Sequence, residues 1–260
     1  MRSFREGWAI QLRVWSALMI RELSTRFGRE NIGFLWVMAE PLLFASLVGG
    51  IWRVWKGPSE YGIPIVAFVA TGYIPLTLFR MAIGRSVGAM KVNSSLLYHR
   101  QIKILDLLLV RFFLEVLGAM MAYIFLGLIL MAVGIFPMPS DLGMFLGGWL
   151  IYCLFTMSVC LIVGPLSEMS EVVEKLVPVT VYVMIPFSGT FTLCSWLTPQ
   201  AREVLAYSPP VSGMEMMRKG IFGDLVTPYY NFGAPFWFIL IATMIGLGLC
   251  RRVRRTLIVE

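Results

Sequence analysis

The chain has 260 residues and a mass of 29.3 kDa, with 58% apolar residues, 14% charged residues and a formal net charge of +7. Soluble domains average about 45–50% apolar and about 25% charged residues, so a soluble protein of this composition could not cover its surface with polar groups. These values exclude an ordinary cytosolic enzyme, a secreted domain and a disordered chain. They indicate an integral membrane protein.

The N-terminal segment is too charged to cross a bilayer. Its apolar residues recur at helical spacing, with charged residues roughly opposite. These apolar positions are Phe4, Trp8, Leu12, Trp15 and Met19. The pattern predicts an amphipathic helix over residues 4–27 that lies on the membrane surface. It is either a plain membrane anchor or a helix that also docks a partner.

Six apolar segments follow, each close to the roughly 20 residues that a helix needs to span about 30 Å of hydrocarbon. They cover residues 33–52, 63–84, 104–134, 143–164, 176–194 and 233–250. We therefore expect an all-α membrane protein with six transmembrane helices and a single transmembrane domain over residues 1–260. The fifth segment contains Pro178, Pro186 and Gly189, and such breaks are tolerated where a helix lines a protein interior or a cavity.

The lysines and arginines predict the orientation, because cytoplasmic connections carry an excess of them. If the N-terminus is cytoplasmic, 17 of the 22 fall on the inner side and five on the outer side. The outer five are Arg53, Lys56, Arg202, Arg218 and Lys219. This excess predicts that both termini are cytoplasmic, and it accounts for most of the net charge.

The cytoplasmic connection over residues 85–103 is short and basic. Asn93 interrupts it, and Leu96, Leu97 and Tyr98 then form an apolar knob. The connection is either a solvated linker or a short helix that inserts into a soluble partner.

The outer connection contains two helix starts. Pro199 follows Thr198 at a first helical position, and Ser212 with Glu215 forms a capping box. Because Pro209 and Pro210 separate the two helices, neither can cross a bilayer. We expect a re-entrant or surface hairpin over residues 198–223 that covers the outer mouth.

Motifs for enzymatic chemistry are absent from the sequence. The chain has one histidine, His99, and no G-x-x-x-x-G-K-[ST] motif, so we expect no catalytic, metal-binding or cofactor-binding residues. Arg111 and Glu115 are one helical turn apart and are expected to form a structural ion pair. No chain of intramembrane carboxylates or histidines suggests a proton relay, so a partner must supply the energy.

Residues 26–41 read R-F-x-x-x-x-I-G-x-L-W-x-x-x-x-P, from Arg26 to Pro41. This motif resembles that of the permease subunits of type-2 ABC exporters, in particular the KpsM-like capsule permeases of the polysaccharide-export branch. Asp106, Arg111 and Glu115 after the cytoplasmic loop are similar to a second element of that family, and residues 208–223 to a third.

The resemblance implies a homodimer in the bacterial inner membrane, with two separate ATPase subunits that bind ATP and Mg²⁺. It also implies an acidic, lipid-linked polysaccharide substrate that passes between the two copies, and periplasmic and outer-membrane partners. The loop and the N-terminal helix would contact the ATPase. The residues expected in this coupling are Trp8, Arg26, Lys91, Val92, Leu96, Leu97 and Tyr98.

A hydrated polymer with apolar sugar faces can be guided by aromatic rings and, if it is anionic, by cations at the two mouths. The aromatic candidates for the path are Trp36, Phe44, Tyr73, Tyr182, Phe187 and Phe191. The cationic candidates are Arg53 and Lys56 near the exit, with Arg80 and Arg85 near the entrance. The inner arginines equally serve orientation and lipid headgroups. The expected outer gate consists of Pro209, Pro210, Glu215 and Arg218.

Two other functions are compatible with the sequence. One is a permease of the same family for O-antigen, teichoic acid or a small lipid. The other is a membrane-embedded transferase, which would need acidic or histidine residues gathered at one interface. Its candidates at the inner face are Glu168, Glu171 and Glu174.

Overall fold

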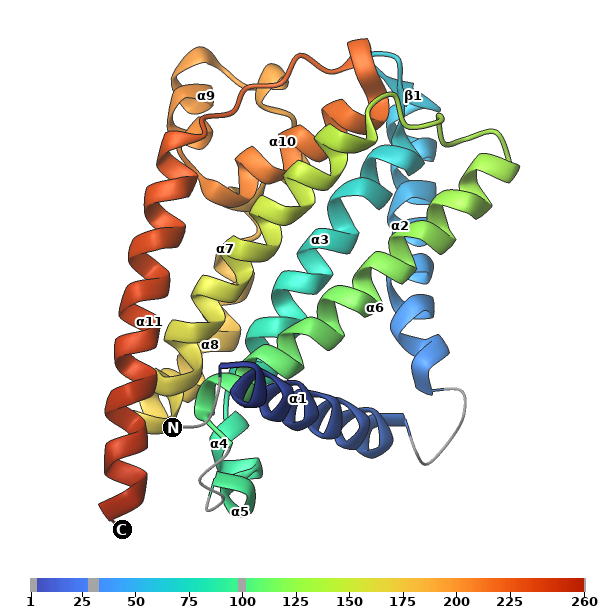
Figure 1. The fold of residues 1–260 in the computed structure, drawn as a ribbon. Coiled ribbons are helices and arrows are strands. Elements are labelled where there is room, and N and C mark those ends of the chain that lie inside the picture. Colours follow the sequence, from blue (N-terminus) through green and yellow to red (C-terminus); the bar gives the residue numbers. More distant parts are fainter. Residues whose placement is uncertain (1–3, 28–32, 98–101, 260) are drawn as a thin grey trace.

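The computed structural model describes residues 4–27, 33–97 and 102–259. Its long helices run side by side, and α1 lies across one end of them (Figure 1). The long helices are α1 (Phe4–Phe27), α2 (Gly33–Lys56), α3 (Ile65–Ser86), α6 (Ile104–Ala132), α7 (Leu142–Met169) and α11 (Gly233–Val259). The shorter helices are α4 (Ala89–Val92), α5 (Ser94–Leu97), α8 (Glu171–Val183), α9 (Pro199–Ala206) and α10 (Pro209–Phe222). The remaining elements are 3₁₀ turns at Pro186–Ser188, Cys194–Trp196 and Gly223–Leu225, and a hairpin of strands β1 (Ser59–Glu60) and β2 (Ile63–Pro64).

Four helices in the described part of the chain are long and apolar enough to cross a bilayer, namely α3, α6, α7 and α11. They have between 22 and 29 residues, and a rise of about 1.5 Å per residue makes each of them longer than about 30 Å. Their positions agree with the second, third, fourth and sixth predicted spans. In α2 the side chains of residues 33–41 lie outside the described part, so the first span remains a prediction.

Both ends of the described chain lie at the same end of the bundle, opposite α9 and the β hairpin (Figure 1). This arrangement agrees with termini on one side of a membrane, and the cytoplasmic identity of that side remains a prediction. The central helix is α3, because 83% of its most apolar window is buried within the chain. The main apolar cluster joins α3 to α6, α7 and α10.

The fifth predicted span, residues 176–194, is not one helix. Its helical part, α8, has 13 residues and ends at Val183, which gives a length of about 20 Å, too short for a bilayer. A short 3₁₀ turn begins at Pro186, and Gly189 follows with a φ of 74°. A fixed proline ring and a left-handed glycine both end the regular helix. The chain then continues as irregular structure to Cys194.

The helix α10 lies inside the bundle beside α7 (Figure 1). All of its residues except Lys219 are buried, which excludes a hairpin that rests on the surface. It begins at Pro209 with Ser208 as its N-cap residue, so the capping box predicted at Ser212 is wrong. The Ser212 hydroxyl instead donates to the carbonyl of Ala206. Pro209 and Pro210 fit the first turn because its N–H groups have no helical partner.

Glycines let α10 approach α7 backbone to backbone. A Cβ atom added at Gly148 of α7 would lie 2.5 Å from the carbonyl oxygen of Gly213 in α10. A Cβ atom added at Gly220 would lie 2.6 Å from the backbone nitrogen of Phe145. Only glycine fits these positions without a shift of one helix.

We expect Gly220→Val to lower the stability of the protein by about 1–3 kcal/mol, because the added methyl groups overpack the contact with α7. Thermal unfolding of the purified protein in lipid nanodiscs measures this loss. Gly127→Val in α6 is the matched control, since a Cβ atom at Gly127 has no neighbour within 4 Å. An equal effect of the two substitutions would contradict the close α7–α10 contact.

Candidate functional site

One buried carboxylate fixes α1 to the start of α6. Oδ1 of Asp106 accepts hydrogen bonds from Nε2 of Gln11 and, at 2.9 Å, from Nε1 of Trp15. Oδ2 of Asp106 accepts the backbone N–H of Lys103 at 3.0 Å and caps α6. Leu18, one turn beyond Trp15, is buried against the same helix. The cap of α6 and the docking of α1 therefore depend on one side chain.

The predicted apolar stripe of α1 is divided between two environments. Trp15 and Met19 pack against α6, whereas Trp8 and Leu12 are about half exposed. The ring of Trp8 meets the ring of Trp15 edge-on at 6.2 Å. The apolar residues away from α6 remain available to a bilayer or a partner.

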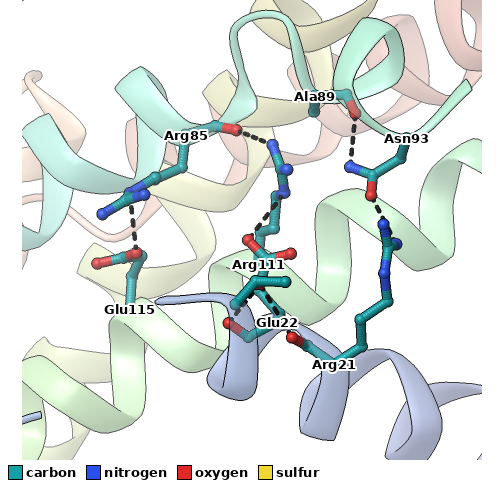
Figure 2. Close-up of polar contacts among 8 residues, drawn as sticks. Arg21, Glu22, Arg85, Ala89, Asn93, Arg111 and Glu115 are labelled. Carbon is teal, nitrogen blue, oxygen red and sulfur yellow. Dashed lines mark hydrogen bonds and ion pairs between the residues drawn. The ribbon is translucent and has the colours of Figure 1, made fainter. Parts of the chain in front are cut away.

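A chain of charged contacts links α1, α3 and α6 (Figure 2). Nε of Arg111 lies 3.3 Å from Oε1 of Glu22 in α1, and Nη1 of Arg111 donates to the carbonyl of Arg85 in α3. Nε of Arg85 in turn lies 3.7 Å from Oε1 of Glu115 in α6. Arg111 and Glu115 thus each contact another helix, an outcome that the sequence did not suggest. Their predicted pairing within α6 remains a prediction.

A buried asparagine links α1 to the connection between α3 and α6. Gly88, with a φ of 63°, turns the chain away from α3 and into α4. Asn93 ends α4, donates from Nδ2 to the carbonyl of Ala89, and accepts at Oδ1 from Nη1 of Arg21 at 2.9 Å (Figure 2). The sequence reasoning treated Asn93 as an interruption. Its signal was the preference of asparagine for helix C-termini.

The residues of this connection that were predicted to contact an ATPase lie in different environments. Nζ of Lys91 donates to Glu174 of α8 at 2.8 Å, and this hydrogen bond raises the pKa of Lys91 above its ordinary value. Val92 is 72% exposed. Leu96 is partly buried against the cluster of α1 and α6, so its side chain is not a free knob. Outside the described part are the side chains of Arg26, Trp36, Leu97 and Tyr98.

We call these contacts at the α1 end of the bundle the inner junction. Its members are Arg21, Glu22, Arg85, Lys91, Asn93, Asp106, Arg111, Glu115 and Glu174. They connect five elements, since α1, α3, α4, α6 and α8 each contribute at least one residue. A force applied at the α4 tip is therefore transmitted to several helices.

The predicted path aromatics lie in different surroundings. Tyr73 of α3 is buried and stacks on Phe44 of α2, with ring centroids 4.2 Å apart. Tyr182 and Phe187 are exposed, and Phe191 packs against Trp52. Tyr73 therefore contributes to the core, whereas the rings of Tyr182 and Phe187 face outward.

The predicted path cations are also distributed over several contacts. The guanidinium of Arg80 in α3 lies 5.7 Å from the ring centroid of Tyr182 in α8. Nζ of Lys56 contacts Glu60 at 3.0 Å and the Trp52 ring at 4.8 Å, and Arg53 is exposed. Among the residues predicted to line the path, Arg80 and Tyr182 are the one pair of a cation and an aromatic ring for which the described part of the chain shows a contact.

At the opposite end, Arg218 of α10 is completely buried. Nη1 donates to the carbonyls of Gly189 at 2.6 Å and Thr192 at 2.9 Å, and Nη2 donates to that of Thr190. The guanidinium also lies 4.0 Å from the ring centroid of Phe68 in α3. One side chain thus satisfies three carbonyls of the irregular segment that follows α8.

Glu215 lies one turn before Arg218 on α10, and its carboxylate binds the backbone of the two segments that contain Cys194 and Tyr229. Oε1 accepts the backbone N–H of Cys194 at 2.9 Å, and Oε2 accepts that of Tyr229 at 3.3 Å. Glu215 and Arg218 were expected at an outer gate, but the structure places both in the interior, so direct contact of these charges with outer solvent is excluded. The available signal was an i, i+3 charge pair within an otherwise small and apolar helix, which is typical of an inward-facing position.

The four apolar helices, the transverse α1 and the buried α10 define a multi-pass α-helical membrane protein. No family model matches the chain. It is 39% identical to the capsule polysaccharide export inner-membrane protein CtrC of Neisseria meningitidis serogroup B, over 94% of this chain and 91% of the relative. It is 36% identical to BexB of Haemophilus influenzae, which has the same description, over 89% and 87%. It is 26% identical to the polysialic acid transport protein KpsM of Escherichia coli, over 95% and 96%.

The chain belongs to the family of capsule polysaccharide export inner-membrane proteins. The resemblance inferred from residues 26–41 is thereby confirmed, although those side chains themselves lie outside the described part. The multi-pass location in the inner membrane is confirmed as well.

We expect Asp106→Ala to release α1 from α6, because it removes the acceptor of Gln11 and Trp15 together with the α6 cap. Hydrogen–deuterium exchange measured by mass spectrometry should increase throughout the α1 peptides. Asp141→Ala is the matched control, since Asp141 caps α7 by accepting the N–H of Met144 at 2.9 Å and lies far along the chain from α1. Each variant loses a cap worth about 0.5–2 kcal/mol. Unchanged exchange of α1 in Asp106→Ala would refute its anchoring role.

We expect Arg218→Met to destabilise the protein by about 3–5 kcal/mol, because it leaves Glu215 without its nearby cation and three carbonyls without donors. Arg218→Lys should rescue only part of this loss, since an ammonium lacks the planar fork that serves several acceptors. Thermal unfolding in nanodiscs gives the comparison. Lys219→Met is the control, because Lys219 pairs only with the exposed Asp224 among the described residues. Equal stability of Arg218→Met and Lys219→Met would contradict the assignment.

Proposed function

We propose that this chain is the permease subunit of an ATP-driven exporter that moves a lipid-linked, acidic capsular polysaccharide across the inner membrane. Two copies form a conduit between them, and two separate ATPase subunits bind ATP with Mg²⁺. The chain itself binds no cofactor and catalyses no reaction, and a periplasmic adaptor and an outer-membrane channel continue the route. The observation that carries the proposal is the match, over nearly the whole chain, to proteins named for capsule polysaccharide export.

The inner junction supports a role in energy coupling. The α4 tip is tied to α1 through Asn93 and to α8 through Lys91. Arg85 and Arg111 connect α3, α6 and α1 at the same end. An ATPase that presses on the exposed Val92 would act on several helices, because α4 is linked to α1 and α8, and α1 is linked in turn to α6 and, through α6, to α3.

The region where α3 meets α8 supports passage of an anionic polymer. Arg80 and Tyr182 place a cation beside an aromatic ring, and Phe187 adds a second exposed ring further along the chain. Rings suit the apolar faces of sugars, and cations attract acidic groups. The outward-facing apolar residues of α2 include Leu43, Leu47 and Ile51. These side chains are available to lipid or to the second copy that the proposal requires.

The relatives named for capsule export favour capsular polysaccharide over O-antigen, teichoic acid or a small lipid as the substrate. A membrane-embedded transferase is the weaker alternative. Its three candidates do not share one environment, since Glu174 is ion-paired with Lys91 whereas Oε2 of Glu168 is buried without a hydrogen-bond partner among the described residues. The alternative is weaker because the relatives are named for export.

Val92→Asp tests both the docking surface and the transported substrate. In a capsule-forming strain that lacks its own permease, we expect the wild-type chain to restore surface polysaccharide. Val92→Asp should instead leave polymer inside the cell and should fail to co-purify with the ATPase, because a buried charge disrupts an apolar contact. Leu96 is unsuitable for this test, since its side chain packs within the chain.

Val204→Asp is the matched control, because Val204 is 74% exposed on α9 at the other end of the bundle. It should co-purify with the ATPase and export normally. If Val92→Asp does the same, the docking assignment is wrong. If the wild-type chain fails to restore surface polysaccharide, the proposed export function is wrong.

A further inference from the structure

An open groove lies between α9 and the chain that enters α11, and its lining residues come from these two segments. Figure 1 shows both segments at the end of the bundle opposite α1. The volume of the groove is about 630 Å³, which lies within the range of roughly 300–1,000 Å³ that is typical of ligand pockets. The side chains that give it chemical character are Glu203, Tyr207, Tyr230, Asn231 and Phe232. We call this feature the exit groove.

Three aromatic rings supply the apolar surface of the exit groove. Tyr207 and Phe232 are 63% and 56% exposed, and Tyr230 meets Phe232 edge-on with centroids 5.0 Å apart. The Tyr230 and Phe232 rings lie at 74° to each other, so each offers its own face or edge to a ligand and the two do not form one flat surface. The two tyrosine hydroxyls add groups that can donate or accept hydrogen bonds.

Two polar side chains in the groove complement these rings. Oδ1 of Asn231 accepts the N–H of Gly233 at 2.8 Å, which orients the amide so that its NH₂ group can donate elsewhere. Glu203 supplies a carboxylate, which accepts hydrogen bonds from hydroxyl or amide groups. The guanidinium of the adjacent Arg202 is directed to three backbone carbonyls and lies 4.3 Å from the Tyr229 ring centroid, and Arg202 does not line the groove.

The exit groove adjoins one end of the predicted path. Tyr207 is followed by Ser208, whose hydroxyl donates to the carbonyl of Phe187 at 3.3 Å. Phe187 is one of the exposed aromatic residues assigned to the path. A polymer that leaves along Phe187 would therefore meet the groove next.

We propose that the exit groove is a saccharide-binding subsite that takes uncharged sugar units from the emerging polymer. The rings stack on the C–H faces of the sugar, Glu203 accepts from its hydroxyl or amide groups, and Asn231 donates to its oxygens. The carboxylate, in a lining without a cation, disfavours acidic units at this point. This inference rests on the proposed function, since it takes the polysaccharide as the transported molecule.

Saturation-transfer NMR on the full-length protein in lipid nanodiscs tests the proposal. Nanodiscs are required because sugar-headed detergents would compete for the groove. The probes are chitotriose, a neutral N-acetylated trisaccharide, and the anionic trigalacturonate. We expect chitotriose to bind and Tyr207→Ala/Tyr230→Ala to weaken its binding by about tenfold or more, the equivalent of about 1.4 kcal/mol.

Two further variants separate saccharide binding from simple membrane anchoring by aromatic residues. Glu203→Gln should bind trigalacturonate more tightly than the wild type does, because the repulsion is removed. Trp55→Ala, which removes an 82% exposed aromatic residue at the end of α2, should leave chitotriose binding unchanged. If chitotriose does not bind, or binds equally to the wild type and the double variant, the rings are membrane anchors and the inference is overturned.

Surface export distinguishes this failure from failure of the proposed function. If the wild-type chain restores surface polysaccharide but its groove does not bind chitotriose, the export function stands and the subsite is rejected. If the wild-type chain does not restore surface polysaccharide, the export function is rejected, and the NMR measurement still decides whether the groove binds saccharide.

Discussion

The interior of a bilayer offers no water to hydrogen-bond a free backbone carbonyl, so each carbonyl in a broken helix needs a partner within the protein. The segment after α8 meets this requirement through Arg218, which donates to Gly189, Thr190 and Thr192. Glu215 performs the converse task for two backbone N–H groups. These two side chains supply partners for the backbone of the irregular segments on either side of α9 and α10. The burial of α10, which carries both residues, follows from this requirement.

At the α1 end of the molecule, charged side chains bind one another and not mainly the backbone. The inner junction consists of ion pairs and hydrogen bonds between side chains of separate helices, several of them half-exposed. Contacts of this kind contribute little stability individually, and they can be rearranged at low cost. Glu215 and Arg218 are buried and hydrogen-bonded to backbone groups, whereas several ion pairs of the inner junction are half-exposed. This difference agrees with the predicted assignment of energy input to the α1 end.

Local patterns in the sequence predicted much of the fold. Apolar runs located four membrane-spanning helices, and the bounds of α1 agree with residues 4–27. Contacts between distant residues could not be predicted in this way. Arg218 binds carbonyls 26 to 29 residues earlier, and Asp106 binds Trp15 from 91 residues away. Such partners depend on the packing of helices, which periodicity does not specify. For this reason Leu96 was expected to project as an apolar knob, and Glu215 and Arg218 were expected at an outer gate.

The glycine contact between α7 and α10 has a mechanical consequence. Two helices whose backbones touch at Gly148, Gly213 and Gly220 have no side-chain layer between them that could deform. If α10 tilted away from α7, it would lose these backbone contacts along its length. We therefore expect the two helices to move together. If the outer mouth of the proposed exporter widens, we expect the change where α10 meets the segments after α8 and before α11, and not between α7 and α10.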